Sequence, residues 1–458
     1  MRSSDHDVVV IGGGAGGLAA ARAAVRRGAT VALVESGRIG GDCTFTGCVP
    51  SKALLAAAAR GEDFTSAMAQ VHRSVEAVAA TEDAAALRRE GIEVVPGRAR
   101  LRSPTEIDVD GRRLRARTVV LATGATPSVP PIDGLADADP LTSETLFSLQ
   151  AQPRRLAVLG GGPIGVEVSQ AFARLGSQVT LLEADARILA KEEPEASEVV
   201  AAALAADGVD VRVGSAASTA ERRGEETVVR TADGAEVVVD RVLVALGRRP
   251  TTADLGLEEI GVELDERGFV ATDPTMATSV SGVYAVGDVA GSLQLTHAAA
   301  RMAEVAVRNA LSRWTRVHAQ RFDPGLVPWA TFTSPELGRV GMTEAEAADH
   351  GGRVAYLPMA EVDRAVATGR TEGFLKLVAG PRPVLRSAGG GRLLGATAVA
   401  AVGGELVHEV ALAMRTRMFT GRLAQTTHTY PSWSMAVQQA AAQFFFEIGG
   451  REARPARG

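Results

Sequence analysis

Two copies of one glycine pattern constrain the fold of this chain more than any other feature. In each copy an apolar strand runs into a G-x-G-x-x-G turn, a helix, a second strand and a terminal glutamate, at the same spacing. The glycines are Gly12, Gly14 and Gly17 in the first copy and Gly160, Gly162 and Gly165 in the second, and the glutamates are Glu35 and Glu183. Such glycines permit a tight turn and close approach of a pyrophosphate, while the acid binds a ribose. The pattern predicts an α/β chain with two Rossmann-type dinucleotide-binding domains.

Two dinucleotides held on one chain most simply exchange electrons. The alternative is a repeated fold in which one copy binds nothing. Further apolar strands end in glycine, namely 119–124 (VVLATG), 242–250 (VLVALGRRP) and 283–288 (VYAVGD), and Gly97-Arg98-Ala99 forms another turn. Each is equally well an ordinary strand-to-turn junction, but together they indicate backbone lining a ligand at the carboxyl edge of a doubly wound sheet.

The charge and hydropathy of the chain exclude several classes of partner. A net charge of -5 and a pI near 5.9 provide no basic field for nucleic acid. No run approaches the roughly 18 apolar residues of a membrane span, and Met1 to Asp7 is a short polar segment without the features of a signal peptide. We therefore expect a cytoplasmic protein that acts on a small molecule and binds neither nucleic acid nor membrane.

The only two cysteines, Cys43 and Cys48, lie five positions apart in a glycine-bounded loop behind the first fingerprint. Pro50 favours a helix that starts just after Cys48, and the dipole of that helix lowers the pKa of a nearby thiol. Lys52, one of only three lysines, adds a positive charge one turn further on. The pattern indicates a redox-active pair. The alternatives are two structural thiols or a zinc site; the second lacks further clustered ligands, so we expect no metal.

These motifs resemble the flavoprotein disulfide reductases, the family of dihydrolipoamide dehydrogenase, glutathione reductase and mercuric reductase. The cysteine segment matches the family's GGTCxxxGCxPSK except at Asp42, and the resemblance extends from about Asp7 to Phe446. It implies bound FAD, NAD(P)H as reductant and a homodimer. The implied division is an FAD-binding domain at 1–150 and 273–326, an NAD(P)-binding domain at 151–272, and an α+β interface domain at 327–450.

The resemblance also implies roles for individual residues. Cys43 is then the interchange thiol that faces the substrate, and Cys48 is the charge-transfer thiolate against the flavin. Lys52 pairs with Glu167 near the flavin N5. Further cofactor contacts are implied for Ala99, Thr123, Gly124 and Asp288 on the flavin side and for Gly247 on the nucleotide side.

The C-terminal part departs from the family at the acid/base His-Glu couple, where Tyr430 and Met435 stand instead. Mercuric reductases also lack this couple, and the segment 327–333 (VPWATFT) resembles theirs. They carry a C-terminal cysteine pair, however, and Glu447 to Gly458 contains none. His428, two residues before Tyr430, is either a substitute proton donor or an ordinary polar histidine.

The sequence predicts an FAD-dependent NAD(P)H oxidoreductase, closest to the mercuric-reductase-like branch, that passes electrons to a soft metal ion, a quinone or a disulfide. Glu183 favours NADH over NADPH. One alternative is a dihydrolipoamide dehydrogenase. Another, of a different class, is a non-catalytic flavin redox sensor.

Overall fold

A computed structural model describes residues 5–312, 318–382, 384 and 386–458. The expectation that the chain opens without a signal peptide falls partly on residues 1–4, outside the described part. The chain forms two compact units. Unit 1 comprises Met1–Pro130, Leu141–Ala151 and Leu246–Pro324, and unit 2 comprises Pro131–Pro140, Gln152–Ala245 and Gly325–Gly458. Residues 246–272 thus cluster with unit 1, and the division into four segments stays a prediction.

The main sheet of unit 1 has the order β3-β2-β1-β6-β5-β4, with β16 also paired to β6. Its strands are β1 (His6–Ile11), β2 (Val31–Glu35), β3 (Ile92–Pro96), β4 (Ala99–Ser103), β5 (Glu106–Val109), β6 (Arg112–Leu121) and β16 (Val283–Ala285). β1 runs parallel to both neighbours, β2 and β6. A strand in this position is covered on both faces, which explains its unbroken apolar run VVVI. A small two-stranded sheet pairs β7 (Ala125–Pro127) with β15 (Arg248–Pro250).

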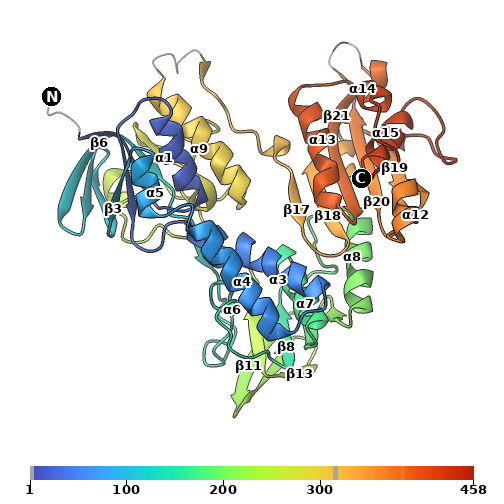
Figure 1. Ribbon diagram of the computed structural model, residues 1–458, viewed down its shortest axis with the longest axis horizontal. Helices are drawn as coiled ribbons and strands as arrows, with labels where there is room; N and C mark the ends of the chain where they lie inside the picture. The colour runs from blue at the N-terminus through green and yellow to red at the C-terminus, as the bar shows by residue number, and fades with distance from the viewer. Residues whose placement is uncertain (1–4, 313–317, 383, 385) are drawn as a thin grey trace. The chain divides into compact units, whose positions relative to one another are not determined.

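Helices cover the sheet of unit 1, and two of them, α1 and α9, lie side by side (Figure 1). The α-helices are α1 (Ala15–Val25), α2 (Gly41–Phe45), α3 (Cys48–Ala59), α4 (Phe64–Ala79), α5 (Ala84–Arg89), α6 (Ser143–Leu146) and α9 (Thr296–Leu311), with 3-10 turns η1 (Glu258–Ile260) and η2 (Gly287–Ala290). A Cβ atom on Gly16 of α1 would lie 3.5 Å from the Cβ of Ala299 on α9. This close approach brings the first turn of α9 toward the fingerprint.

The segment around the cysteines is helical, which corrects the expectation of a loop. Cys43 lies inside α2, and α3 begins at Cys48 itself, two residues before Pro50. Gly40 and Gly41 have φ values of 118° and 62°, a left-handed backbone that separates α2 from the preceding chain. The hydroxyl of Thr46 donates to the carboxylate of Asp42 at the other end of the short helix.

Unit 2 contains the second dinucleotide fold, a parallel sheet of order β10-β9-β8-β14. Its strands are β8 (Arg155–Leu159), β9 (Gln178–Leu182), β10 (Asp210–Arg212) and β14 (Arg241–Val244), and its helices are α7 (Pro163–Arg174) and α8 (Pro194–Ala206). Unit 2 also contains a separate antiparallel sheet, formed by β11 (Ala217–Arg223), β12 (Glu226–Thr231) and β13 (Glu236–Val239). The predicted strand at 242–250 is interrupted, because β14 ends at Val244 and β15 belongs to unit 1.

The C-terminal part of unit 2 is the predicted α+β fold. Its sheet has the order β17-β18-β21-β20-β19-β22, antiparallel throughout. The strands are β17 (Trp329–Thr331), β18 (Glu336–Gly341), β19 (Arg353–Pro358), β20 (Phe374–Gly380), β21 (Arg392–Ala400) and β22 (Arg454–Pro455). The helices are α11 (Glu344–Ala348), α12 (Asp363–Thr368), α13 (Gly403–Arg415), α14 (Thr420–Gln425) and α15 (Met435–Ala442). The 3-10 turns are η3 (Pro324–Leu326), η4 (Met359–Glu361) and η5 (Ala388–Gly390). Helices α13 and α15 pack on the sheet around an apolar core. Within the described residues, no helix is both long and apolar enough to span a bilayer.

Candidate active site

Both glycine fingerprints have the backbone geometry of a dinucleotide-binding turn. The first glycine of each, Gly12 and Gly160, has φ near +106°, which only glycine adopts without strain (106° and 107°). A Cβ atom on the third glycine, Gly17 or Gly165, would lie 1.8 Å from the carbonyl oxygen of the first. Glycine is therefore required at both ends of each turn, and the helix that follows packs directly on the turn. Two independent turns of the same chain thus fit a dinucleotide.

The glutamate at the end of the second strand binds the glycine turn in the same way in both copies. Glu35 accepts hydrogen bonds from the backbone N–H groups of Gly13 at 2.5 Å and Gly37 at 2.6 Å. Glu183 accepts from Gly161 at 2.6 Å and Asp185 at 2.8 Å. Each carboxylate is thereby held beside the middle of its glycine turn, where a ribose diol would be bound.

Arg187, four residues beyond Glu183, makes hydrogen bonds to its own loop and to helix α8. Its guanidinium donates to the carbonyl groups of Leu189 at 3.2 Å, Ala190 at 2.6 Å and Glu192 at 2.9 Å, and to the hydroxyl of Ser197 at 2.8 Å. These four bonds hold the guanidinium group in place beside the start of α8.

The two cysteines form a thiol–thiolate pair. Cys43 and Cys48 are both unbridged in this structure and hydrogen-bond to one another. The Sγ atom of Cys48 also lies 3.3 Å from the hydroxyl of Thr296, the first residue of α9. The N-terminal ends of two helices, α3 and α9, therefore converge on one sulfur, and their positive dipole ends favour a thiolate there.

The electrostatic environment divides the proton unequally between the two sulfurs. The hydrogen bond from Cys43, with smaller contributions from Thr296 and Lys52, lowers the pKa of Cys48 to about 6 against the effect of burial. The hydrogen bond to Cys48, together with burial, raises the pKa of Cys43. At neutral pH Cys48 is the thiolate and Cys43 keeps its proton.

Asp42, the position that departs from the family pattern, is paired with an arginine. The Nη2 atom of Arg248 lies 2.5 Å from the carboxylate of Asp42, and its Nε atom lies 3.5 Å from that of Asp288. Burial raises the pKa of Asp288 to about 6, while Arg248 opposes this rise. Arg248 thus partly neutralises two acids beside the thiolate. Neither Arg248 nor Thr296 was among the predicted site residues, although Arg248 follows the predicted Gly247 directly.

Other predicted residues on the flavin side lie in unit 1. Ala99 begins β4, and Gly124 has φ +72°. The hydroxyl of Thr123 donates to the carbonyl of Thr251 at 2.6 Å, which ties the two segments together. Gly247, predicted to contact the nicotinamide nucleotide, also belongs to unit 1, where its carbonyl accepts from the N–H of Ser128 at 2.9 Å. Their roles as cofactor contacts stay predictions.

Lys52 and Glu167, the predicted pair, lie in different units. Lys52 is on α3, within electrostatic range of Cys48. Glu167 is buried on α7, where its Oε1 atom accepts a hydrogen bond from the N–H of Phe332 at 2.8 Å. Their pairing near a flavin stays a prediction.

The segment that replaces the acid/base couple lies at the surface of unit 2. Tyr430 is 67% exposed, and a hydrogen bond to Asp363 raises its pKa above the usual 10. The ring of His428 is bound on both sides, with Nδ1 at 2.9 Å from the carbonyl of Thr426 and Nε2 at 3.0 Å from the carboxylate of Glu409. These two contacts fix the orientation of the ring. A role of Tyr430 or His428 as proton donor to the substrate stays a prediction.

Known proteins share the whole of this architecture. Residues 6–303 match the pyridine nucleotide-disulphide oxidoreductase family, and residues 327–441 match the dimerisation domain of the same family. The chain is 35% identical over 460 residues to a dihydrolipoyl dehydrogenase of Thermus scotoductus, covering 95% of this chain and 96% of the relative. It is 34% identical over 476 residues to a mercuric reductase of Streptomyces lividans, covering 97% of each.

A solved structure agrees with these relatives. The Cu(II) complex of the HOCl-induced flavoprotein disulfide reductase RclA from Escherichia coli superposes with a TM-score of 0.86 at 29% identity, covering 96% of this chain and 99% of that one. The family model, the relatives and the fold lead to one conclusion. The chain belongs to the pyridine nucleotide-disulphide oxidoreductases, a family of FAD-dependent enzymes that use NAD(P)H.

Proposed function

We propose that this enzyme passes electrons from NADH through FAD to a Cys43–Cys48 disulfide, and from the resulting thiols to a small thiophilic acceptor. The observation that carries the proposal is the pair itself. The Sγ atom of Cys48 lies 3.3 Å from the hydroxyl of Thr296, beside the first glycine fold, and Cys43 and Thr296 both lower the pKa of this thiol. A structural pair of buried thiols has no need of such stabilisation.

The residues present fit FAD in unit 1. The Gly12 turn would approach a pyrophosphate, Glu35 is held where a ribose would bind, and the half-buried Asp288 would accept from sugar hydroxyls. Held by these residues, FAD would supply two-electron transfer from NADH to the disulfide. Breaking the S–S bond with these two electrons and one proton yields the Cys48 thiolate and the Cys43 thiol. Oxidation of the pair by a two-electron acceptor forms the bond again and releases that proton.

NADH is the proposed reductant because Glu183 presents a carboxylate to the ribose. A carboxylate accepts hydrogen bonds from a ribose diol and repels a 2′-phosphate. Arg187 does not compensate this repulsion, since it donates four hydrogen bonds to three carbonyl groups of its loop and to the hydroxyl of Ser197 on α8.

A soft metal ion is the first acceptor to be tested. Two adjacent sulfur ligands, one of them a thiolate at neutral pH, suit soft metals. Among its relatives are mercuric reductases, and the superposed RclA structure is a Cu(II) complex. Such an acceptor needs no proton shuttle, and neither do quinones, in keeping with Tyr430 and Met435 at the positions of the acid/base couple. The overall similarity to a dihydrolipoyl dehydrogenase favours a second candidate, oxidation of lipoyl dithiols.

The proposed enzyme is a cytoplasmic homodimer, assembled through its dimerisation domain. Its acceptor is identified by steady-state NADH oxidation with Hg(II), Cu(II), benzoquinone, glutathione disulfide and lipoamide in turn. We expect turnover with the metal ions or the quinone. Sustained turnover with any acceptor would exclude the alternative of a non-catalytic redox sensor. Fast turnover with lipoamide alone would show that the enzyme oxidises lipoyl dithiols, the second candidate function.

A further inference from the structure

The loop that carries Glu183 is held from its far end by strands of the C-terminal sheet. This loop, residues 183–193, connects β9 to α8. At its start Glu183 binds the N–H of Gly161, and the N–H of Leu189 donates to the Gly161 carbonyl at 2.9 Å. Both contacts seat the loop on the second glycine turn. The position of the loop thus decides where Glu183 and Arg187 lie relative to a bound nucleotide.

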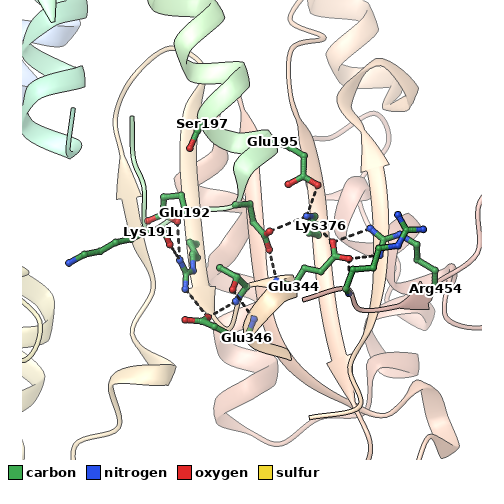
Figure 2. Close-up of polar contacts among 12 residues, drawn as sticks. Lys191, Glu192, Glu195, Ser197, Glu344, Glu346, Lys376 and Arg454 are labelled. Carbon is green, nitrogen blue, oxygen red and sulfur yellow. Dashed lines mark hydrogen bonds and ion pairs between the residues drawn. The ribbon is translucent and has the colours of Figure 1, made fainter. Parts of the chain in front are cut away.

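Lys376 is the centre of the contacts at the far end (Figure 2). It is 1% exposed on β20, and its ammonium group lies 3.1 Å from Glu193, 2.8 Å from Glu195 and 3.1 Å from Glu344. Glu193 ends the loop and also accepts from the N–H of Glu344 at 2.7 Å. A lysine buried among three carboxylates is strongly fixed, because removing it would leave buried negative charges unpaired.

Two further side chains of the same sheet hold the loop one and two residues earlier. Glu192 accepts from the indole N–H of Trp329 at 2.9 Å and lies 3.3 Å from Arg339. The Nη1 atom of Arg339 also donates to the carbonyl of Lys191 at 2.5 Å, and its guanidinium lies over the Trp329 ring at 4.8 Å. Three consecutive residues of the loop are therefore bound by the C-terminal part of the chain.

Arg187 links the two ends of the loop. Two of its bonds go to the carbonyl of Glu192 and the hydroxyl of Ser197, close to the residues that Lys376 and Arg339 hold. If the far end moves, Arg187 loses these acceptors and becomes available to a phosphate. The contacts of Lys376 and Arg339 with the loop should therefore affect both the affinity for the nucleotide and the preference for NADH over NADPH.

We propose that Lys376, with Arg339 and Trp329, is a positioning residue for the nicotinamide nucleotide, which fixes the loop so that Glu183 faces the ribose and Arg187 is withheld from a 2′-phosphate. The proposal rests on the proposed function, since it takes Glu183 as the ribose ligand. It adds that the C-terminal sheet determines nucleotide binding in the same chain, beyond any part it has in dimerisation.

The test compares Lys376→Met with the matched control Lys191→Met, which removes an exposed lysine of the loop itself whose side chain points away from Lys376 (Figure 2). We expect Lys376→Met to raise KM for NADH about 10-fold, less than the ~100-fold loss that a 1 Å misplacement can cause. The kcat should stay within about twofold, and the preference for NADH over NADPH should shrink. Lys191→Met should leave all three unchanged. A role in stability alone would lower Tm without changing the nucleotide preference.

Two further variants keep the test decisive. Lys376→Arg should restore KM, since it keeps the charge. Should Lys376→Met fail to fold, Trp329→Phe removes one hydrogen bond to Glu192 and should weaken NAD⁺ binding about 3-fold by calorimetry, the effect of one hydrogen bond. Calorimetry is independent of turnover, so a wild type that does not oxidise NADH contradicts the proposed function while the loop contacts are still tested. Folded variants with unchanged nucleotide affinity and preference would overturn the inference.

Discussion

The hydroxyl of Thr296 lies 3.3 Å from the sulfur of Cys48, although 248 positions separate the two residues in the chain. Thr296 is the first residue of α9, and Cys48 is the first residue of α3. A hydrogen-bond donor and two helix N-termini thus meet at the sulfur whose pKa is lowered to about 6.

Removing this hydroxyl should raise the pKa of Cys48. Thr296 lowers that pKa, so the thiolate of Thr296→Val should form at higher pH than that of the wild type. In the reduced wild type, the thiolate-to-flavin band should be present above about pH 6 and be lost as the pH falls. We expect the midpoint to rise by about 0.5 to 1 unit in Thr296→Val, since one hydrogen bond is worth about 1 kcal/mol. Thr296→Ser keeps the hydroxyl and serves as control; an equal shift in both variants would contradict the assignment.

Changes at Asp42 and Arg248 should move the same midpoint in opposite directions. Asp42 raises the pKa of Cys48 by its charge, so Asp42→Asn should lower the midpoint by about 0.5 unit. Arg248→Met removes the ion-pair partner of Asp42 and should raise the midpoint. The measurement is a pH titration of the long-wavelength band. Shifts of the same sign would show that the pair acts through structure and not through charge.

Glu183→Ala should reduce the preference for NADH, measured as the ratio of kcat/KM for NADH to that for NADPH. The carboxylate binds a ribose diol and repels a 2′-phosphate, so both effects act in the same direction. Glu35→Ala is a closely matched control, because Glu35 binds the first fingerprint as Glu183 binds the second. It should lower FAD content and leave the ratio unchanged. A wild type that prefers NADPH would refute Glu183 as the selector.

Dithiol substrates should react slowly, because exchange needs an acid and a base that typically contribute ~10²- to 10⁴-fold. A hydrogen bond to Asp363 raises the pKa of Tyr430 above 10, so it is a poor base near neutral pH. The double variant Tyr430→His with Met435→Glu should raise lipoamide turnover, whereas Tyr430→Phe should leave the low wild-type rate unchanged. Wild-type lipoamide turnover equal to that of an ordinary dihydrolipoyl dehydrogenase would contradict this prediction.

The sequence predicted those parts of the fold that depend on local patterns. The fingerprint glycines require a particular φ and a close approach, so the turns at Gly12 and Gly160 follow from residue type alone. The predicted order of strand, turn, helix and strand is present around both turns. The segment around Cys43 was predicted as a loop because its glycines and polar residues resemble one, yet five residues of it form α2.

The contacts across the fold could not be predicted in the same way. Arg248 and Thr296 reach the cysteine segment across 206 and 248 positions, and no periodicity connects residues so far apart. Lys376 is one of only three lysines in the sequence, but only the sheet shows that three carboxylates surround it. Long-range pairing of charges depends on tertiary packing, which a single sequence does not display.

The central claim is that electrons from NADH reach the Cys43–Cys48 pair through FAD, and one anaerobic titration tests it most directly. The purified enzyme is titrated with NADH at pH 7.5 while its visible spectrum is recorded. We predict a long-wavelength thiolate-to-flavin band in the wild type, and none in Cys48→Ser, in which that thiolate cannot form. Reduction of the flavin without this band in the wild type, or its persistence in Cys48→Ser, would contradict the account.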